Sequence, residues 1–557
     1  MESGPVNHMH SAYSTSLIQA LMSGISIHAH ILFPDTHFSE FFPLQSRKQR
    51  IFPMILKTVR RVLAVLMFIL VTFLFVDVSG FGARWFGWAA SLQFIPAVLA
   101  LNIFVVAAVV FATLVFGRIY CSIVCPLGIL QDLVSHLRNS ISRRFGKRHF
   151  YKFHRALPYV RWSFFALFAA TLVAGIMAVP VVLEPYSAYG RMVAQLLSPL
   201  YTYGNNLLAS AAACTDSYIF SGMEYWFHGT TALAVALISF IVIGLFALDG
   251  RTYCNTFCPV GTLLGFISRW SWLKVRVDES RCNHCGSCAR FCKAHCIDSP
   301  NSSIDASRCV ACGNCLGHCR QGALHYSGPL PKRQGPTPVE NTAKSQTEGT
   351  ETTRRAFLLT TATVTAGAAM AQAEKKVDGG LAVIEDKVVP ERRKRLLPPG
   401  AESDRHLHQH CTACQLCITQ CPNGVLRPST ELNHFMQPEM GYENGYCRPE
   451  CNRCSEVCPT DAIRLIDLAE KSSIKIGTAR VVRKNCLMNE GKHCGNCARH
   501  CPAGAISIVP LDSSEQPKYG PVVDAERCIG CGACENLCPV RPVSAIVVDG
   551  IEQQRTI

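Results

Sequence analysis

The chain has 557 residues, 30 cysteines and a formal net charge of +15 at pH 7. A disulfide-stabilised secreted domain is normally short, so this length and cysteine count argue against that class. A positive charge is also typical of nucleic-acid binding, but the excess lies largely beside apolar segments, where basic loops set membrane topology. We therefore expect no nucleic-acid partner and assign the cysteines to metal chemistry.

Residues 1–50 form a leader without metal-site spacing, which we expect to be poorly ordered. Four apolar segments come next, and three of them carry no Asp, Glu, Lys or Arg. About 20 apolar residues cross the hydrocarbon core of a bilayer as a helix. We therefore predict an α-helical membrane bundle over residues 51–265, with spans at 62–76, 94–117, 162–183 and 229–248.

The distribution of basic residues predicts how these spans are oriented. The loop 118–161 holds nine Lys and Arg residues, whereas the loops 77–93 and 184–228 hold one each, Arg84 and Arg191. Basic loops stay on the cytoplasmic side. Both ends of the bundle are therefore predicted to be cytoplasmic, in a bacterial inner membrane.

A sequence repeat follows the second and the fourth predicted span. The pattern R-x-Y-C-x3-C-P-x-G occurs at 118–128 and again at 251–261. A C-x3-C spacing places both thiols on one face of a helix. Four thiolates converging at the cytoplasmic surface would bind a metal or a further cluster, and the alternative is two redox-inert or disulfide-bonded pairs. The predicted metal or redox site consists of Cys121, Cys125, Cys254 and Cys258.

The predicted outer loop contains the candidates for a quinol-binding site. A carboxylate, tyrosines and an arginine follow the third span, where they can accept protons and hydrogen bonds from a quinol. Tyrosines at this depth are also ordinary interfacial anchors, so the alternative is a structural role. The candidates are Glu184, Tyr186, Tyr189 and Arg191.

Residues 266–326 carry two C-x2-C-x2-C-x3-C runs, the pattern of a two-cluster ferredoxin. In that α+β fold each [4Fe-4S] cluster takes three cysteines from one run and the fourth from the other. Lys293 and Arg320 stand where a proline usually follows, and Cys296 is a spare that competes with Cys292. A zinc ribbon is the alternative. The predicted ligands are Cys282, Cys285, Cys288 and Cys319 for one cluster, and Cys309, Cys312, Cys315 and Cys292 for the other.

A flexible linker is predicted at 327–351, and an export signal at 352–373. The signal combines Arg354-Arg355, a weakly apolar run and a closing Ala-Gln-Ala, as twin-arginine signals do. Iron–sulfur clusters are assembled in the cytoplasm, so a domain that carries them must cross the membrane folded, through the twin-arginine translocase. The segment is then a fifth, tethering span or a cleavage site. The alternative is a vestigial segment that leaves all clusters cytoplasmic.

A charged connector at 374–405 leads to a ferredoxin-like domain at 406–557 with four further cysteine runs. Their sixteen thiolates match four [4Fe-4S] clusters, which makes six in the whole chain. The runs pair either as neighbours or nested, first with fourth and second with third. We favour the nested order, because the two runs with insertions are adjacent. The runs are Cys411, Cys414, Cys417, Cys421; Cys447, Cys451, Cys454, Cys458; Cys486, Cys494, Cys497, Cys501; and Cys528, Cys531, Cys534, Cys538.

These motifs resemble those of two kinds of known protein. Through Cys319 the chain resembles NapH-type membrane quinol dehydrogenase proteins and the membrane part of NosR-like and CcoG-like polyferredoxins, which share the C-x3-C-P pairs after spans two and four. From Thr352 it is similar to NapG and MauM, the twin-arginine-exported four-cluster ferredoxins. The long gap between Cys486 and Cys494 is the most specific match, while the second run departs from that family's spacing. The resemblance implies a fusion of two normally separate proteins.

The resemblance also implies electron transfer from a quinol to a periplasmic reductase, directly or through a cytochrome, with nitrate reductase the first candidate. Residues 266–351 would then be cytoplasmic and residues 374–557 periplasmic. Whether the chain is itself an enzyme, as a quinol dehydrogenase component, stays open. The alternative is an accessory or maturation protein that supplies electrons or metal to a metalloenzyme. The sequence predicts no carrier across the ~30 Å apolar core, because it puts the C-x3-C-P cysteines on the inner side.

Overall fold

The computed structural model describes residues 45–77, 79–146, 150–214, 221–224, 226–328, 385–511 and 518–557. The chain divides into two compact units, Met1–Phe52 and Pro53–Ile557. Apart from the start of its first helix, every helix and strand in the described ranges belongs to the second unit. The predicted export signal at 352–373, the linker from 329 on and most of the leader lie outside the described residues.

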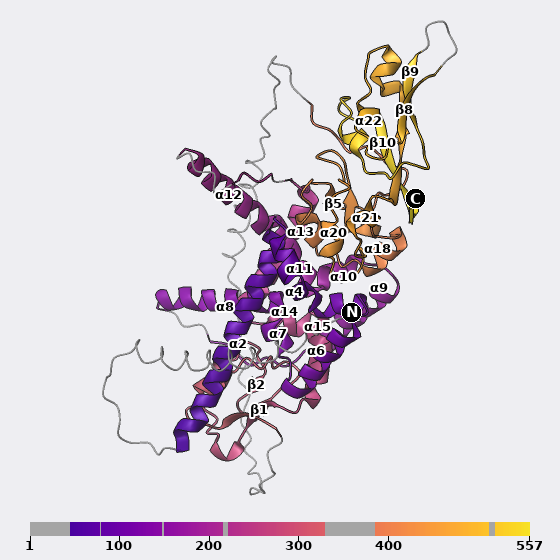
Figure 1. The fold of residues 1–557 in the computed structure, drawn as a ribbon. Helices are drawn as coiled ribbons and strands as arrows, with labels where there is room; N and C mark the ends of the chain where they lie inside the picture. The colour runs from indigo at the N-terminus through magenta and orange to yellow at the C-terminus, as the bar shows by residue number, and fades with distance from the viewer. Residues whose placement is uncertain are drawn as a thin grey trace, which may run out of the picture. The chain divides into compact units, whose positions relative to one another are not determined.

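The first part of the second unit is helical up to residue 267 (Figure 1). Runs without charged residues form the helices Ile103–Phe116, Ser198–Ala213 and Thr230–Leu248. Prolines stand at the first position of several others, where the missing N–H costs nothing. The helices are α2 (Gln45–Val76), α3 (Phe81–Phe86), α4 (Trp88–Ser91), α5 (Phe94–Leu99), α6 (Ile103–Phe116), α7 (Tyr120–Ile123), α8 (Pro126–Arg144), α9 (Pro158–Val173), α10 (Ala178–Leu183), α11 (Pro185–Met192), η1 (Val193–Leu197), α12 (Ser198–Ala213), α13 (Thr230–Leu248), α14 (Thr252–Thr256) and α15 (Pro259–Ile267).

Within the described ranges, two helices are long and apolar enough to cross a membrane, Lys57–Val76 and Thr230–Leu248. The expectation of uninterrupted helices over 94–117 and 162–183 was wrong. The first is broken after α5, where Asn102 accepts a hydrogen bond from the Val105 amide and so begins α6. The second is broken at Gly175, whose left-handed φ of 75° ends α9 before α10 begins.

The first cysteine-rich segment forms a small α+β unit, named here the first ferredoxin segment. Strand β1 (Lys274–Val277) pairs antiparallel with β4 (Leu324–Ser327), and β2 (Ile297–Asp298) pairs with β3 (Ser303–Ile304). Short helices carry the cysteine loops between them: η2 (Ser268–Trp270), η3 (Glu279–Arg281), α16 (Ser287–Arg290) and η4 (Leu316–His318).

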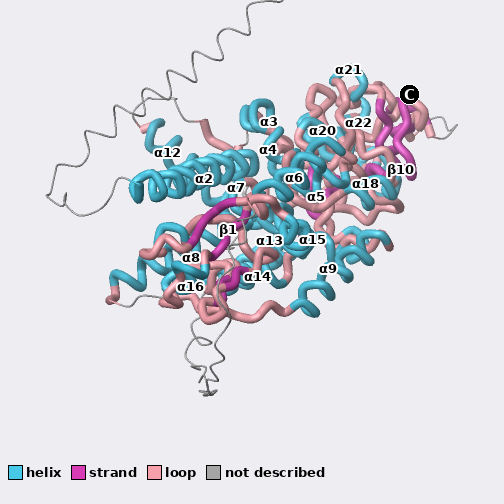
Figure 2. The backbone as a smooth tube through the Cα atoms, turned by 90° about the horizontal axis from the view of Figure 1, so that it is seen from below, coloured by secondary structure: helices cyan, strands magenta, loops and turns pink. Residues whose placement is uncertain are grey.

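The second ferredoxin segment, residues 404–556, consists mostly of loops, with short helices and three antiparallel strand pairs (Figure 2). The pairs are β5 (Leu426–Pro428) with β6 (Pro438–Met440), β7 (Ile474–Val481) with β10 (Ile546–Thr556), and β8 (Ile506–Pro510) with β9 (Tyr519–Val523). The helices are α18 (Asp404–His410), α19 (Leu416–Thr419), η5 (Leu432–His434), α20 (Arg453–Glu456), α21 (Leu468–Lys471), η6 (Arg483–Asn485), η7 (Leu487–Glu490), α22 (Asn496–Arg499) and α23 (Ala533–Asn536).

The apolar stretch Lys57–Val76 of helix α2 touches both ferredoxin segments, one near each of its ends. At Lys57 its side chain lies beside Gly313 and Gly317 of the first segment. Twenty residues later the chain meets the second segment, where Gln420 Nε2 donates to the carbonyls of Leu74 at 2.8 Å and Asp77 at 2.5 Å. The 17 residues from Lys57 to Leu74 span about 25 Å of helix, at 1.5 Å per residue. The two ferredoxin segments therefore contact opposite ends of the apolar stretch Lys57–Val76 of α2.

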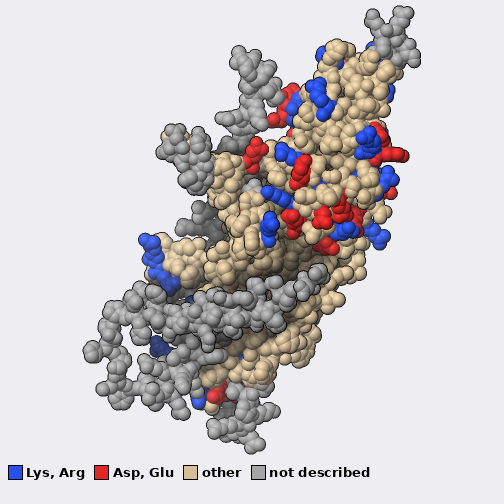
Figure 3. Space-filling model, in the orientation of Figure 1, with Lys and Arg blue, Asp and Glu red and all other residues tan. Residues whose placement is uncertain are grey.

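Charged side chains are unevenly distributed over the surface. On the face shown in Figure 3, Lys, Arg, Asp and Glu gather over the second ferredoxin segment and are sparse over the helices. The helices expose large apolar side chains instead, including Phe104, Phe111, Ile238 and Phe240. An exposed apolar surface of this extent marks a partner or a membrane.

Candidate metal centres

The first ferredoxin segment brings its two cysteine runs together, as predicted. Cys288 lies within electrostatic reach of Cys319, and the Ser287 hydroxyl donates to the His318 carbonyl at 3.3 Å. The run that ends in Cys319 therefore supplies the fourth position of the first site, as crossed ligation requires. The backbone N–H of Ala323 donates to Cys319 Sγ at 3.3 Å, the kind of bond that stabilises a cluster thiolate.

The second site of this segment is a small cavity lined by five cysteines instead of four. The three of the second run lie opposite both Cys292 and Cys296. The sulfurs of Cys292 and Cys296 are 3.5 Å apart, so the competition predicted between them is a real geometric choice. The lining cysteines are Cys292, Cys296, Cys309, Cys312 and Cys315.

The second ferredoxin segment pairs its runs as neighbours, so the nested order was wrong. One cavity joins Cys421 to the second run, and two others join Cys538 to the third run and Cys501 to the fourth. Cys458 lies within electrostatic reach of all three remaining cysteines of the first run. The four sets are Cys411, Cys414, Cys417, Cys458; Cys447, Cys451, Cys454, Cys421; Cys486, Cys494, Cys497, Cys538; and Cys528, Cys531, Cys534, Cys501.

A hairpin between consecutive runs explains this pairing. Strands β5 and β6 lie between the first and second runs, and β8 and β9 lie between the third and fourth. The first ferredoxin segment repeats the arrangement with β2 and β3 between its own runs. An antiparallel hairpin returns the chain to its start, so the run after it must face the run before it. The chain thus contains three run–hairpin–run units.

The chemistry of these six sets fits iron–sulfur clusters. Thiolate ligands of clusters accept hydrogen bonds from nearby backbone amides, which also tune the potential. Such donations at 3.3–3.4 Å reach the sulfurs of Cys411, Cys458, Cys501, Cys528 and Cys538.

The four cysteines of the C-x3-C-P pairs also converge. The short helices α7 and α14 carry Cys121 and Cys254, and Cys125 and Cys258 stand just before α8 and α15. All four are at most 4% exposed, and their thiols lie within electrostatic reach of one another. Gln131 Nε2 donates to Cys254 Sγ at 3.1 Å. We call this group the four-cysteine site.

Reciprocal arginine contacts join the two repeats at this site. Arg118, from the first repeat, donates to the carbonyl of Cys254 in the second at 3.4 Å. Arg251, from the second repeat, donates to the carbonyl of Cys121 in the first at 2.5 Å. The motif glycines permit this exchange, because a Cβ on Gly128 or Gly261 would lie within 2.4 Å of the Cys121 or Cys254 carbonyl oxygen, respectively.

The two buried arginines differ in their other partners. Arg251 forms two 2.7 Å bonds to the Asp132 carboxylate, which Lys293 also contacts. Burial alone would raise the pKa of Asp132, but Arg251 and Lys293 outweigh burial and hold this pKa well below its usual range. Arg118 instead binds Asn255 Oδ1 at 2.8 Å and the Ser307 carbonyl at 3.0 Å. In the part of the chain that the structure describes, no carboxylate forms an ion pair with Arg118.

The four residues predicted for a quinol site lie together and are buried, and in the described residues the Tyr186 hydroxyl has no hydrogen-bond partner. Glu184 caps α11 by accepting from the Tyr186 amide at 3.0 Å, and Tyr189 bonds to Thr72 at 2.5 Å. Arg191 donates to the Val181 carbonyl at 2.8 Å and the Ala413 carbonyl at 3.3 Å. Each is at most 3% exposed. The loop that carries Cys414 packs against these residues.

The residues that complete this contact carry no signal in the sequence. Gln195 donates to Gln415 at 2.9 Å, and His408 lies 2.5 Å from the Gly175 carbonyl. Gly190 approaches the Cys414 carbonyl so closely that a Cβ would stand 2.6 Å from its oxygen. These are single polar or small residues, which show no periodicity to detect.

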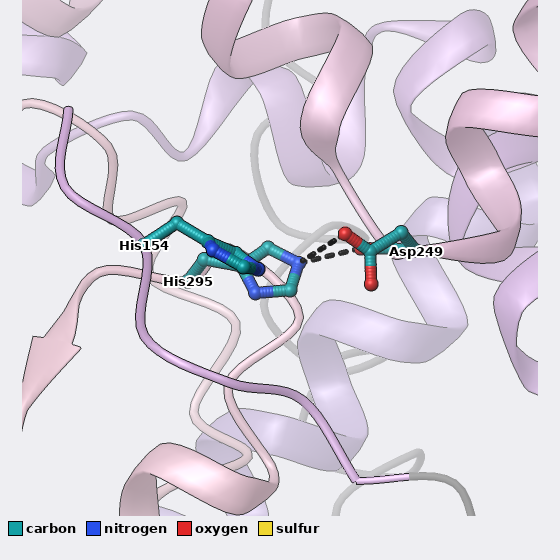
Figure 4. Close-up of side chains that lie close together, drawn as sticks. All are labelled: His154, Asp249 and His295. Atoms are coloured by element: carbon teal, nitrogen blue, oxygen red, sulfur yellow. Dashed lines mark hydrogen bonds and ion pairs between the residues drawn. The ribbon is translucent and has the colours of Figure 1, made fainter. Parts of the chain in front are cut away.

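One group of two histidines and a carboxylate has the spacing of metal ligands, but the ring nitrogens of His295 have other partners. His154, Asp249 and His295 lie within 4.8 Å of one another (Figure 4). However, the two ring nitrogens of His295 lie 2.6 Å from the Lys152 carbonyl and 2.5 Å from the Asp249 carbonyl. Both ring nitrogens therefore face backbone carbonyls at hydrogen-bond distance. Through the contact of His295 with Asp249, this group connects the first ferredoxin segment to the end of α13.

Comparison with known families agrees with the cluster chemistry. A family described as "4Fe-4S binding domain" matches residues 98–148 and 231–277. Families described as "4Fe-4S dicluster domain" match residues 305–425 and 491–541. The match to the family described as "4Fe-4S binding domain" covers both C-x3-C-P pairs.

Several curated proteins are similar to about a third of the chain. They include "Putative electron transport protein YccM" of Escherichia coli, 25% identical over 36% of this chain and 47% of that protein. "Ferredoxin-type protein NapH" of Escherichia coli is 26% identical over 37% of this chain and 58% of its own length. "Methylamine utilization ferredoxin-type protein MauN" of Paracoccus denitrificans is 24% identical over 37% and 56%.

The chain spans about half the length of the curated relatives it matches. No solved structure matches it. The comparisons therefore establish the nature of part of the chain: it contains 4Fe-4S ferredoxin domains, and over a third of its length it is similar to NapH- and MauN-type ferredoxin proteins.

Proposed function

We propose that the chain is a membrane-bound iron–sulfur protein that takes electrons from quinol and passes them to a periplasmic reductase or cytochrome. The helical part is the membrane anchor, with α2, α13 and the interrupted α5–α6 and α9–α10 as its four spans. The observation that carries the proposal is the contact of the two ferredoxin segments with opposite ends of the apolar stretch Lys57–Val76 of α2. The basic loop 118–161 lies on the side of the first segment, which is therefore cytoplasmic.

In this arrangement the second ferredoxin segment reaches the periplasm through the twin-arginine signal at 352–373. That signal, and the resemblance to NapG behind it, rest on sequence alone. The second segment is held at the outer end of the helices by Gln420, Arg191 and His408.

Each of the six cluster sets, when loaded, accepts and donates one electron. The chain's own contribution is spacing and potential. Neighbouring sets share a hairpin, and the amide of Cys447 donates to the carbonyl of Cys531 at 3.0 Å, which joins the two outer units. The four outer clusters therefore form one continuous series.

Quinol oxidation is assigned to the outer end, near Glu184 and Tyr186. The Tyr186 hydroxyl is buried without a hydrogen-bond partner in the described residues, and it lies within electrostatic reach of Cys414. A quinol headgroup that reached this hydroxyl would be beside the first outer cluster. Nitrate reductase is the first candidate acceptor, by resemblance to NapH.

The test uses the purified full chain in detergent, with clusters loaded and oxidised. Reduced menaquinol or ubiquinol analogues should bleach the cluster absorbance, and a Tyr186→Phe variant should do so more slowly. If neither quinol ever bleaches the clusters, quinol oxidation is excluded. Reporter fusions along residues 330–420 then test the side of the membrane, because an inactive export signal would leave both segments cytoplasmic.

A second candidate is an accessory protein that supplies electrons or metal during assembly of a metalloenzyme. The four-cysteine site favours it, since four buried thiols can hold a metal in transit. Metal analysis separates the two functions. A transferable copper or zinc ion at this site supports the accessory role, and a stable iron centre supports electron transfer.

A further inference from the structure

We propose that the four-cysteine site holds a redox-active iron–sulfur centre that relays electrons between the two ferredoxin segments. This inference rests on the proposed function, since it takes the two ends of α2 as the two faces of a membrane. It supplies a carrier across the apolar core, where the sequence predicts none. Three independent observations carry it: buried charge, contacts toward the first segment, and contacts toward the second.

The charge around the site calls for an anion. Two buried cations, Arg251 and Lys293, share the single carboxylate of Asp132, and a third, Arg118, has no ion pair in the described residues. Buried charges occur paired or with a metal centre, because an unpaired one is costly to desolvate. A centre held by four thiolates carries net negative charge and lies directly beside both arginines: Arg118 Nη2 stands 3.8 Å from Cys121 Sγ. Four neutral thiols would leave the surplus positive charge uncompensated.

Toward the first ferredoxin segment, the site is one side chain away from a cluster loop. Arg118 bridges the Cys121 thiol and the Ser307 carbonyl, two residues before the cluster ligand Cys309. Asn255 makes a second bridge, since its amide donates to the Ala294 carbonyl at 3.1 Å. That carbonyl lies between Cys292 and Cys296. The four-cysteine site therefore packs directly against the second cluster site of this segment.

Toward the second ferredoxin segment, two buried side chains connect the four-cysteine site to a cluster loop. Tyr253 lies within electrostatic reach of Cys258 on one side and of Arg191 on the other. Arg191 in turn donates to the Ala413 carbonyl, next to the cluster ligand Cys414. Packed protein of this kind supports electron tunnelling, whose rate falls steeply with distance, so an intermediate centre is needed for a membrane crossing of this length.

The electron balance is simple. A reduced cluster of the first segment gives one electron to the oxidised centre, which becomes more negative by one charge. The centre then gives that electron to the oxidised cluster of Cys411, Cys414, Cys417 and Cys458, and both donors are reoxidised. No bond forms or breaks, and no proton is taken up. The reverse direction uses the same steps, and the relative potentials decide between them.

The identity of the metal follows from this role. Zinc would satisfy four thiolates but has no redox chemistry. Iron–sulfur clusters are bound by four cysteines and change charge by one electron. The match of residues 98–148 and 231–277 to a family described as "4Fe-4S binding domain" agrees with iron.

The first experiment measures the centre itself, in the full chain in detergent. The variant pair is Cys125→Ser with Cys258→Ser, and the control is Cys214→Ser, because Cys214 is exposed and belongs to none of the sets. The cysteine pair should lose the iron of one cluster per chain and one reduced-state paramagnetic signal. The control should lose neither. Zinc in place of iron, or unchanged iron in the pair, overturns the proposal.

The second experiment measures transfer in sealed vesicles that contain the full chain. Reduced anthraquinone disulfonate outside and ferricyanide inside serve as impermeant donor and acceptor. Wild type and Cys214→Ser should carry electrons inward, and the cysteine pair should fall to the rate of protein-free vesicles. If the pair carries electrons as fast as wild type, the relay is wrong and the proposed function survives. If wild type carries none, the two-sided arrangement fails, and the relay fails with it.

A milder variant guards against misfolding. Gln131→Leu removes the 3.1 Å donation to Cys254 Sγ but keeps all four thiols. Hydrogen bonds to cluster sulfurs raise the reduction potential, since they stabilise the more negative state. The signal lost in the cysteine pair should therefore remain in Gln131→Leu with a lower midpoint potential, while the six other clusters keep theirs. An unshifted midpoint would refute the assignment of that signal to this site.

Discussion

Asp132 ties the four-cysteine site to the first ferredoxin segment, and its removal gives a prediction with a calculable size. The Asp132→Asn variant keeps the shape but leaves the Arg251 guanidinium, which is fully buried, and the Lys293 ammonium, 8% exposed, without a carboxylate. Breaking a buried pair on one side costs about 3–5 kcal/mol, because the remaining charge is uncompensated. Here two cations lose one partner, so the upper part of that range applies.

The assay is hydrogen exchange of the Arg251 amide, measured by mass spectrometry on the cluster-loaded full chain. This amide donates to the Lys293 carbonyl at 2.9 Å, so its protection reports separation of the two regions. A loss of about 3–5 kcal/mol lowers the protection roughly two to four orders of magnitude, at 1.36 kcal/mol per tenfold step. Asp278→Asn is the control, since in the described residues Asp278 forms its ion pair with the exposed Arg281 and otherwise accepts hydrogen bonds from Ser280.

The effect of pH gives a further check on the same variant. The folded pKa of Asp132 is depressed, so its contribution is complete above the unfolded pKa of about 3.9 and is lost only below it. The difference between wild type and Asp132→Asn should therefore stay constant from pH 8 to pH 6. Two results refute the reasoning: a difference that shrinks over this interval, or a loss of protection no larger than that of Asp278→Asn.

Two further predictions concern positions of close approach. Gly190→Ala places a Cβ 2.6 Å from the Cys414 carbonyl oxygen, so we expect docking to weaken by about 1–3 kcal/mol and cluster absorbance to be lost at a lower temperature. Gly204→Ala is the matched control, because nothing lies within 4 Å of its Cβ, and an equal loss in both variants would contradict the close packing. Cys292→Ser should lower the iron content per chain, whereas Cys296→Ser should leave it unchanged. The opposite pattern would make Cys296 the ligand.

The convergence of the four-cysteine site could be predicted from the sequence, because the repeat stands at equivalent places in two helix pairs. The structure also explains the other residues of the motif. Arg118 and Arg251 each donate to a carbonyl of the other repeat. Gly128 and Gly261 leave the space that these contacts need. The partner of Arg251 could not be predicted. Asp132 belongs to no motif, and Lys293 stands out in the sequence only because it replaces a proline.

The prediction of how the cysteine runs pair in the second ferredoxin segment failed for a different reason. The spacing of cysteines within a run says which residues share a loop, but not which loops meet. The hairpins decide that, and β5–β6 and β8–β9 are too short, at three to five residues a strand, to stand out as an alternating pattern. Similarly, the helix breaks at Asn102 and Gly175 each depend on one residue inside an apolar run.

The exchange of arginines between the repeats has a consequence for how the chain is made. During synthesis, Arg118 leaves the ribosome long before residues 254 and 255, which supply its partners. Until the second repeat is synthesised, Arg118 lacks the partners with which it is buried, and only two of the four thiols are present. Each repeat therefore obtains the carbonyl partner of its arginine, and the set of four thiols is complete, only when both repeats have been made.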